Sequence, residues 1–194
     1  MNSSYVLQYS LVFIFSLLVP HRCAAPIEKL SADTISKTCE QCAQKASSSL
    51  TYDFCYTSLD AVPLSHVADP AGLGLIALEL ALENTTTTAS TISSILNKNE
   101  SNPGYSCLKQ CFELYLDISV KLEESIKDFV YGKNYDVVYL WVSEIMQQTH
   151  VCEAGFKEKG VESPLTKENH NLSQLCSIVL CIMDLIRSDL RSWF

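Results

Sequence analysis

The sequence predicts an all-α protein: an up-and-down four-helix bundle preceded by a disulfide-pinned N-terminal helical hairpin. Four long segments have apolar residues at alternating three- and four-residue steps, the spacing of one buried helix face. Short polar stretches with glycine or proline separate them, which favours antiparallel neighbours. No segment alternates as a β strand would, and only 6 glycines and 6 prolines occur in 194 residues.

Residues 1–25 have the features of a secretory signal peptide. The apolar run Leu11–Val19 is followed by the small residues Cys23-Ala24-Ala25. The cleavage site stays open, because no Lys or Arg precedes the run and Pro26 is unfavourable after a cut. The run is far shorter than the roughly 20 residues of a membrane span. We expect no later span and a secreted product.

Residues 26–63 are expected to form the hairpin, with a first helix over about 27–46 and a short second helix over 52–59. Ser47-Ser48-Ser49 breaks the first helix, and the second returns Cys55 towards Cys39. A bridge that closed this loop would stabilise a unit with little core of its own by roughly 3 kcal/mol.

Residues 64–194 are expected to form the bundle, with helices over about 71–97, 105–131, 134–156 and 171–193. Each helix has one apolar face that would pack against its neighbours. These faces consist of Leu75, Leu78, Leu82, Ala89, Ile92 and Leu96; Leu108, Cys111, Tyr115, Ile118, Leu122, Ile126 and Phe129; Val138, Val142, Ile145, Cys152 and Phe156; and Leu172, Leu175, Val179, Ile182, Ile186 and Leu190.

The start of the first bundle helix also matches a nucleotide-binding pattern. Gly72-Leu73-Gly74-Leu75-Ile76-Ala77 has the spacing of a dinucleotide fingerprint. That fingerprint needs a buried strand before it, and the preceding residues 65–70 are a polar turn. We therefore interpret these glycines as helix-start and packing positions.

Nine cysteines occur, and eight of them follow the signal peptide, which contains Cys23. An even number in an oxidising compartment indicates disulfides before metals, although spacing alone does not assign the pairs. Cys39-Glu40-Gln41-Cys42 has C-x-x-C spacing. It lacks both a strand-to-helix setting and a second pair of that spacing, so a structural role is favoured.

The sequence contains no grouping typical of catalysis, metal binding or nucleic-acid binding. The net charge is −8 and Lys and Arg are scattered, so no basic face for phosphate is expected. An acidic surface suits a basic protein partner, or serves solubility alone. His66, His150 and His170 have no partner at ligand spacing. We expect no enzyme activity, metal or cofactor; a carrier of apolar ligands is the alternative, and it would need a cavity.

Five stretches, taken together, carry a family resemblance. They are Ile35–Cys39 with Tyr52–Cys55, Asp69–Gly74, Cys111–Tyr115, Thr149–Phe156 and Ser163–Asn169. In this combination the chain resembles the plant invertase and pectin methylesterase inhibitors, and the last stretch is especially similar to the plane-tree pollen type within that family. The resemblance covers essentially the whole mature chain.

This resemblance implies the hairpin-and-bundle fold and two disulfides, Cys39 with Cys55 and Cys111 with Cys152. Four further cysteines depart from the family pattern: Cys42, Cys107, Cys176 and Cys181. They could form more bridges, link two copies or remain buried thiols, which pack as small hydrophobes. Buried thiols are favoured for Cys176 and Cys181.

The implied function is inhibition of a cell-wall or vacuolar enzyme, invertase or pectin methylesterase, through a helical surface in the apoplast, cell wall or vacuole. Known invertase inhibitors of the family have Pro-Lys-Phe at the start of the third bundle helix. The matching positions here are Lys133, Asn134 and Tyr135, without the proline. They are the candidate target contacts, with inward packing of Tyr135 as the alternative. Tyr139 and Trp141 beside them are more typical of core or groove.

Three Asn-x-Ser/Thr sequences indicate N-glycosylation in a secreted chain, at Asn84, Asn99 and Asn171. Asn99 is the best candidate because it lies in a predicted loop. Asn84 lies off the apolar stripe of its helix, which leaves it possible. Asn171 could instead be the N-cap of the last helix.

Overall fold

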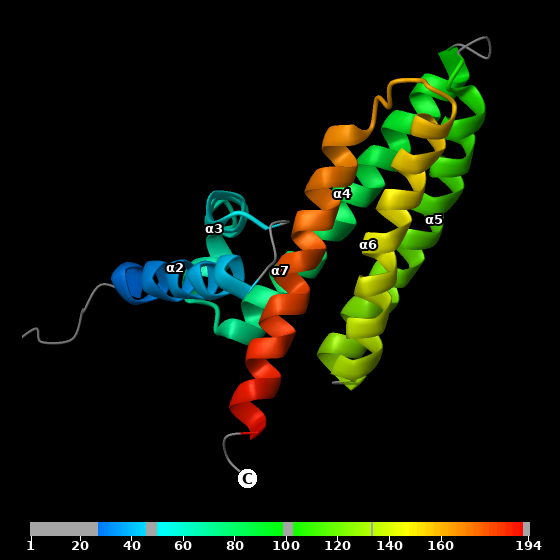
Figure 1. Ribbon diagram of the computed structural model, residues 1–194. Coiled ribbons are helices and arrows are strands. Elements are labelled where there is room, and N and C mark those ends of the chain that lie inside the picture. Colours follow the sequence, from blue (N-terminus) through cyan, green and yellow to red (C-terminus); the bar gives the residue numbers. More distant parts are fainter. Residues whose placement is uncertain (1–26, 46–49, 99–102, 133, 192–194) are drawn as a thin grey trace, which may run out of the picture.

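The computed structural model describes residues 27–45, 50–98, 103–132 and 134–191, and every regular element in these ranges is helical (Figure 1). The first elements are α2 (Ile27–Lys45), α3 (Tyr52–Asp60) and the 3-10 turn η1 (Pro63–Val67). Then come α4 (Pro70–Lys98), α5 (Tyr105–Lys127), the π-helical turn η2 (Asp128–Gly132), α6 (Tyr135–Glu158) and α7 (Thr166–Arg191). The predicted signal peptide, 1–25, lies outside the described residues.

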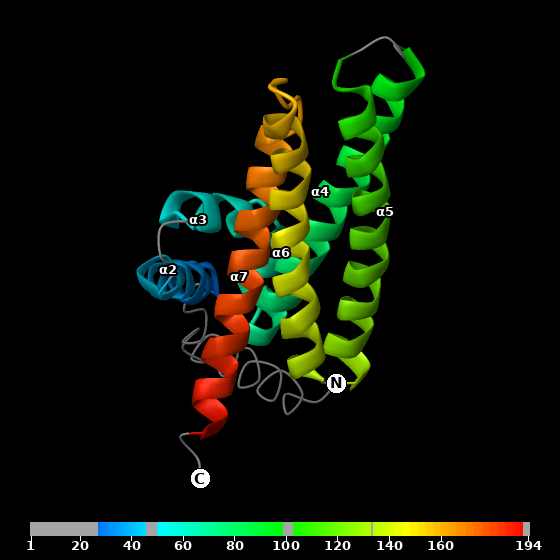
Figure 2. The same cartoon turned by 45° about the vertical axis from the view of Figure 1, so that its right-hand side comes forward.

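The four long helices run side by side, and the hairpin of α2 and α3 lies on the α7 side of them (Figures 1 and 2). Helix α4 contacts α5 and α7, and α6 contacts the same two helices, so the four close into a ring around one core. Short connections make consecutive helices antiparallel. The predicted all-α fold, an up-and-down bundle with a preceding hairpin, is confirmed.

Most residues of the apolar faces predicted from the sequence lie in the core of the bundle, and five are half-buried against it: Leu75, Leu82, Leu96, Ile126 and Ile186. The side chain of Leu190 lies outside the described part of the chain. Tyr115 and Leu122 on α5 and Val138 and Ile145 on α6 are fully buried. Helix α7 differs from the others, because residues 172–179 are all buried in succession. It contacts α4, α6, α2 and α3, so these turns have neighbours on several sides.

Helix α7 begins at Thr166 rather than at the predicted Asn171. Its first turn, Thr166–Asn169, is polar, so the apolar period of the sequence begins later than the helix does. The Asn169 N–H donates to the Leu165 carbonyl at 2.8 Å and closes that turn. Asn171 is therefore inside the helix, and its alternative role as N-cap is wrong.

By length and composition alone, the segment Thr166–Ser188 of α7 could also cross a membrane. That no segment after the signal peptide spans a membrane stays a prediction. However, 61% of the apolar stretch within this segment is buried inside the protein, and the core helix of a bundle has the same length and composition. The burial of α7 between the other bundle helices and the hairpin is sufficient reason for its apolar sequence.

The two glycines at the start of α4 have the helix-start and packing roles that the sequence predicts. The Gly72 N–H donates to Oδ1 of Asp69 at 2.7 Å, and Pro70 occupies the first position, where no N–H is needed. A Cβ on Gly74 would lie 3.1 Å from Cγ2 of Ile182 and 3.2 Å from Cζ of Phe129. Gly74 thus lets α7 and η2 approach α4 closely.

Two disulfides hold the hairpin. Cys39 on α2 is bonded to Cys55 on α3 with a Cα–Cα distance of 5.6 Å, the pair that the resemblance implied. A second bond joins Cys42 to Cys181 on α7, with a Cα–Cα distance of 5.5 Å. The expectation that Cys181 is a thiol is wrong, because α2 packs against α7 and brings these two cysteines together. Cys176 is a buried free thiol, and burial raises its pKa to about 12.

Candidate interaction surface

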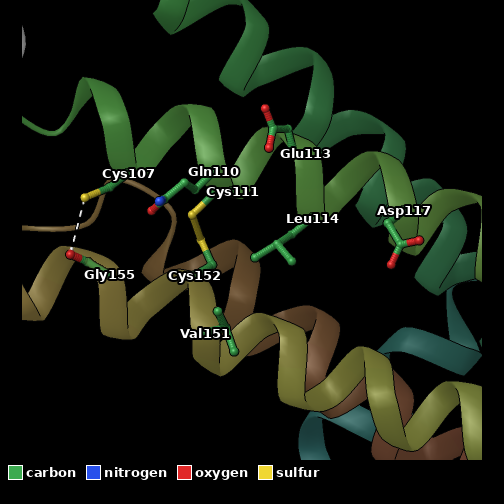
Figure 3. A pocket seen from close by; sticks show the side chains of 9 residues that line it. All are labelled: Cys107, Gln110, Cys111, Glu113, Leu114, Asp117, Val151, Cys152 and Gly155. Carbon is green, nitrogen blue, oxygen red and sulfur yellow. Dashed lines mark hydrogen bonds between the residues drawn. A yellow bond between two sulfur atoms is a disulfide. The ribbon is translucent and has the colours of Figure 1, made fainter.

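The disulfide between the second and third bundle helices lies in a groove. Cys111 on α5 is bonded to Cys152 on α6, also as the resemblance implied, with a Cα–Cα distance of 5.2 Å. The groove has a volume of ≈ 500 Å³ and is lined further by Gln110, Glu113, Leu114, Asp117 and Val151 (Figure 3). Cys107, one turn before Cys111, keeps a buried thiol that donates to the Gly155 carbonyl at 3.3 Å. This thiol therefore serves helix packing.

The connection from α6 to α7 is held by the carboxylate of Glu153. Ser163 Oγ and Asn169 Nδ2 donate to its Oε1 at 2.7 and 2.6 Å, and Thr166 Oγ1 donates to Oε2 at 3.0 Å. The Tyr115 hydroxyl donates to Asn169 Oδ1 at 2.8 Å, and burial raises the pKa of that tyrosine above its ordinary value. These bonds explain why the end of the loop and the first turn of α7 are polar: their side chains anchor the loop to Glu153.

A charged cluster joins α5 to α6 on the surface. Lys121 Nζ donates to Asp117 Oδ2 at 2.6 Å and to Glu144 Oε1 at 2.8 Å. Gln148 Nε2 donates to the same Asp117 oxygen at 2.7 Å. The bonds from Lys121 and Gln148 lower the pKa of Asp117. Because both carboxylates are 51% exposed, solvent screens these ion pairs and their contribution to stability is small.

The predicted target contacts lie where α6 begins. Lys133 is outside the described residues, and Asn134 is exposed at the N-cap with no side-chain capping bond. Tyr135 is half-buried, and its ring meets the edge of Phe129 with centroids 5.2 Å apart. Tyr135 therefore packs inward, which was the alternative to its role as a target contact. Tyr139 packs under Arg187 at 4.8 Å, and Trp141 is half-buried.

The turn before these residues exposes an aromatic side chain that the sequence analysis did not single out. In η2, Phe129 is buried, whereas Tyr131 is 86% and Val130 is 39% exposed. The sequence predicts one α-helix up to Tyr131, whereas in the structure the α-helix ends at Lys127 and a π-helical turn begins at Asp128. One feature of the sequence does indicate this exposure: Tyr131 is next to Gly132 and lies just past Phe129, the last residue of the predicted apolar face.

Two of the three predicted glycosylation sites lie in the described residues, and they line one groove. Asn84 in the middle of α4 and Asn171 in α7 are both half-buried, beside a groove of ≈ 470 Å³ that α3 also lines. Asn84 Oδ1 is buried and has no hydrogen-bond partner. Asn99 lies outside the described ranges.

The described side chains place no group of three or more His, Cys, Asp or Glu where a metal ion could bind. His66 lies beside Asp60, with Nε2 3.7 Å from Oδ1, and among the described residues these two form a pair and not a metal-binding group of three. The two grooves described above lie between helices, and a third of ≈ 410 Å³ lies between the end of α6 and residues 160–163 of the loop that follows it. A carrier would instead need an enclosed apolar cavity among the core side chains.

The described helices form a bundle with a disulfide-linked hairpin, and the apolar faces of the helices pack into its core. The chain belongs to the family "Plant invertase/pectin methylesterase inhibitor", whose model matches residues 33–182. This is a family of enzyme inhibitors, not of enzymes, so its members have a protein target such as an invertase or a pectin methylesterase.

Similar proteins cover nearly the whole chain. A Platanus acerifolia protein named "Putative invertase inhibitor" is 37% identical over 182 residues, 93% of this chain and 98% of its own length. A Platanus orientalis protein of the same name is 39% identical over 158 residues, 81% of this chain and 92% of its own. "Pectinesterase inhibitor 28" from Oryza sativa subsp. japonica is 26% identical over 175 residues, 84% of this chain and 74% of its own.

The fold is also found in solved structures. The crystal structure of mutant form A of a pectin methylesterase inhibitor from Arabidopsis matches with a TM-score of 0.63, over 78% of this chain and 95% of that chain. The structure of a pectin methylesterase inhibitor from Arabidopsis thaliana matches with a TM-score of 0.56. Both are 19% identical to this chain, so they establish the shared fold.

Proposed function

We propose that this chain is a secreted inhibitor that binds a plant invertase or pectin methylesterase through a helical surface at the connection between α5 and α6. The observation that carries the proposal is the family match over residues 33–182. Invertase is the first target to test, because the two Platanus relatives that are 37% and 39% identical are named for it.

The proposed binding surface is centred on the start of α6, with Lys133, Asn134 and Tyr135 as its predicted contacts. Asn134 is exposed and its side chain makes no capping bond, so it is free to face a partner. Tyr135 supports the surface from below through its contact with Phe129. Inhibition of this kind needs a rigid face and a well-packed central contact, and no catalytic group.

The proposal includes the processing and organisation expected from the sequence. Residues 1–25 would be removed as a signal peptide, leaving a hairpin of residues 26–63 and a bundle of residues 64–194 in the apoplast or cell wall, or in the vacuole. Glycans are proposed at Asn84, Asn99 and Asn171. Mass spectrometry of the secreted protein before and after glycosidase treatment tests the cleavage site and each asparagine separately.

The decisive experiment titrates the secreted, oxidised protein in parallel into an acid invertase and a pectin methylesterase at mildly acidic pH. We expect saturable inhibition of one of the two enzymes. The same preparation after unfolding and reductive alkylation is the control and should not inhibit. Inhibition of neither enzyme by protein whose helical circular dichroism is intact would refute the proposed function and leave the fold standing.

A further inference from the structure

We propose that Tyr131, on the π-helical turn η2, is the central contact residue through which this chain binds its target enzyme. The inference rests on the proposed function and identifies the residue that dominates that surface. It places the centre of the surface at a tyrosine just before the candidate contacts Lys133, Asn134 and Tyr135 in the chain.

The exposure of Tyr131 has no counterpart among the other large hydrophobic residues described by the structure. Its side chain is 86% exposed, and the next in order are Val67 at 69% and Leu64 at 68%. The neighbouring Val130 adds apolar area at 39% exposure. A tyrosine combines a large apolar ring with a hydroxyl, and this combination is typical of residues that dominate protein interfaces.

The backbone that presents Tyr131 is anchored on both sides. Before it, Phe129 is buried against Gly74 of α4, with its Cζ 3.2 Å from where a glycine Cβ would lie. After it, Tyr135 makes a T-shaped contact with the same Phe129 ring. The Asn134 N–H donates to the Asp128 carbonyl at 3.2 Å and closes the turn. A contact residue held on a fixed turn loses little conformational entropy when it binds.

One charge near the turn is paired with a neighbouring helix. The Asp136 carboxylate at the start of α6 pairs with the Arg187 guanidinium of α7. The partner that fits an exposed tyrosine is a concave protein site that takes the aromatic ring, with a polar group to pair with its hydroxyl.

The test compares three variants of the full chain, secreted and oxidised, in the inhibition assay that detects the wild-type activity. Tyr131→Ala removes the ring and hydroxyl, and Tyr131→Phe removes the hydroxyl alone. Val151→Ala is the control, because Val151 is 58% exposed on α6, the helix that follows η2. It lies 16 residues beyond Tyr135, about 24 Å along the helix axis.

We expect Tyr131→Ala to raise the inhibition constant at least about 30-fold, the effect of a dominant interface residue. Tyr131→Phe should have a smaller effect and Val151→Ala almost none. All three variants should keep the wild-type thermal midpoint, since both side chains are exposed.

Two results would overturn the inference while the proposed function stands. One is wild-type inhibition by Tyr131→Ala. The other is an equal loss in Val151→Ala, which would show a contact spread along α6 instead of one centred on η2. If the wild-type chain inhibits neither enzyme, the proposed function fails first and this inference fails with it.

Discussion

At the scale of single residues, two helical glycines have opposite surroundings. Gly74 lies where α4, α7 and η2 meet, and a methyl group there would be 3.1 Å from Cγ2 of Ile182 and 3.2 Å from the Phe129 ring. At Gly155 on α6 the nearest atom to an added methyl group would be Gln110 Oε1, at 3.9 Å. The same substitution should therefore have opposite effects at the two sites.

We expect Gly74→Ala to lower the free energy of unfolding by about 1–3 kcal/mol, because the core must shift to admit the methyl group. Gly155→Ala should raise it by about 0.5–1 kcal/mol, because alanine loses less backbone entropy in a helix than glycine. Urea unfolding followed by circular dichroism measures both, and each variant is the control for the other. A Gly74→Ala variant as stable as the wild type would show that Phe129 moves freely, against the anchoring proposed for η2.

Two tyrosines only four residues apart, Tyr131 and Tyr135, have different environments: the first is exposed and the second is half-buried. Both are aromatic residues at the connection between α5 and α6, and the family resemblance made Tyr135 one of three candidate contacts, with inward packing as its alternative. The π-helical turn directs Phe129 into the core, where it offers an edge to Tyr135 and leaves Tyr131 outside. Sequence periodicity could not separate the two tyrosines, because an α-helical period does not describe a π turn.

At the scale of elements, the hairpin is joined to the bundle by a disulfide with a long sequence separation. Cys39 and Cys55 are 16 residues apart, whereas Cys42 and Cys181 are 139 residues apart. A bond that closes a longer loop removes more conformational entropy from the unfolded chain. The bond from α2 to α7 should therefore stabilise the fold more than the bond within the hairpin.

Replacing Cys42 and Cys181 together by alanine should lower the free energy of unfolding by about 4–5 kcal/mol, against about 3 kcal/mol for the Cys39 and Cys55 double variant. Denaturant unfolding of the two double variants beside the wild type measures this difference. An equal or smaller loss in the Cys42 and Cys181 variant would contradict the chain-entropy argument and indicate that packing of α2 against α7 holds the hairpin by itself.

At the scale of the whole molecule, the net charge of the full sequence is −8. For a target with a positive surface, this charge would accelerate association over long distances, and salt would screen it. The contact at Tyr131 acts only at short range, so it should govern dissociation instead.

We expect the association rate constant with the target enzyme to fall as ionic strength rises from about 0.01 M to about 1 M, over which the Debye length falls from about 30 Å to about 3 Å. Surface plasmon resonance measures both rate constants. The Tyr131→Ala variant is the control: its association rate should have the same salt dependence, with faster dissociation. An association rate independent of salt would show that the target has no complementary charge.

The sequence by itself determined the helical class, the four core faces and the sites of the main breaks. These features depend on residues three or four positions apart and on local turn chemistry, which are visible along the chain. Only the tertiary structure decided that Cys42 meets Cys181, that α7 begins at Thr166 and that Tyr131 is exposed. Each of these depends on contacts between segments far apart in the sequence, or on a loop anchored by a distant carboxylate. No local period encodes which of several cysteines or tyrosines will lie against a neighbouring helix.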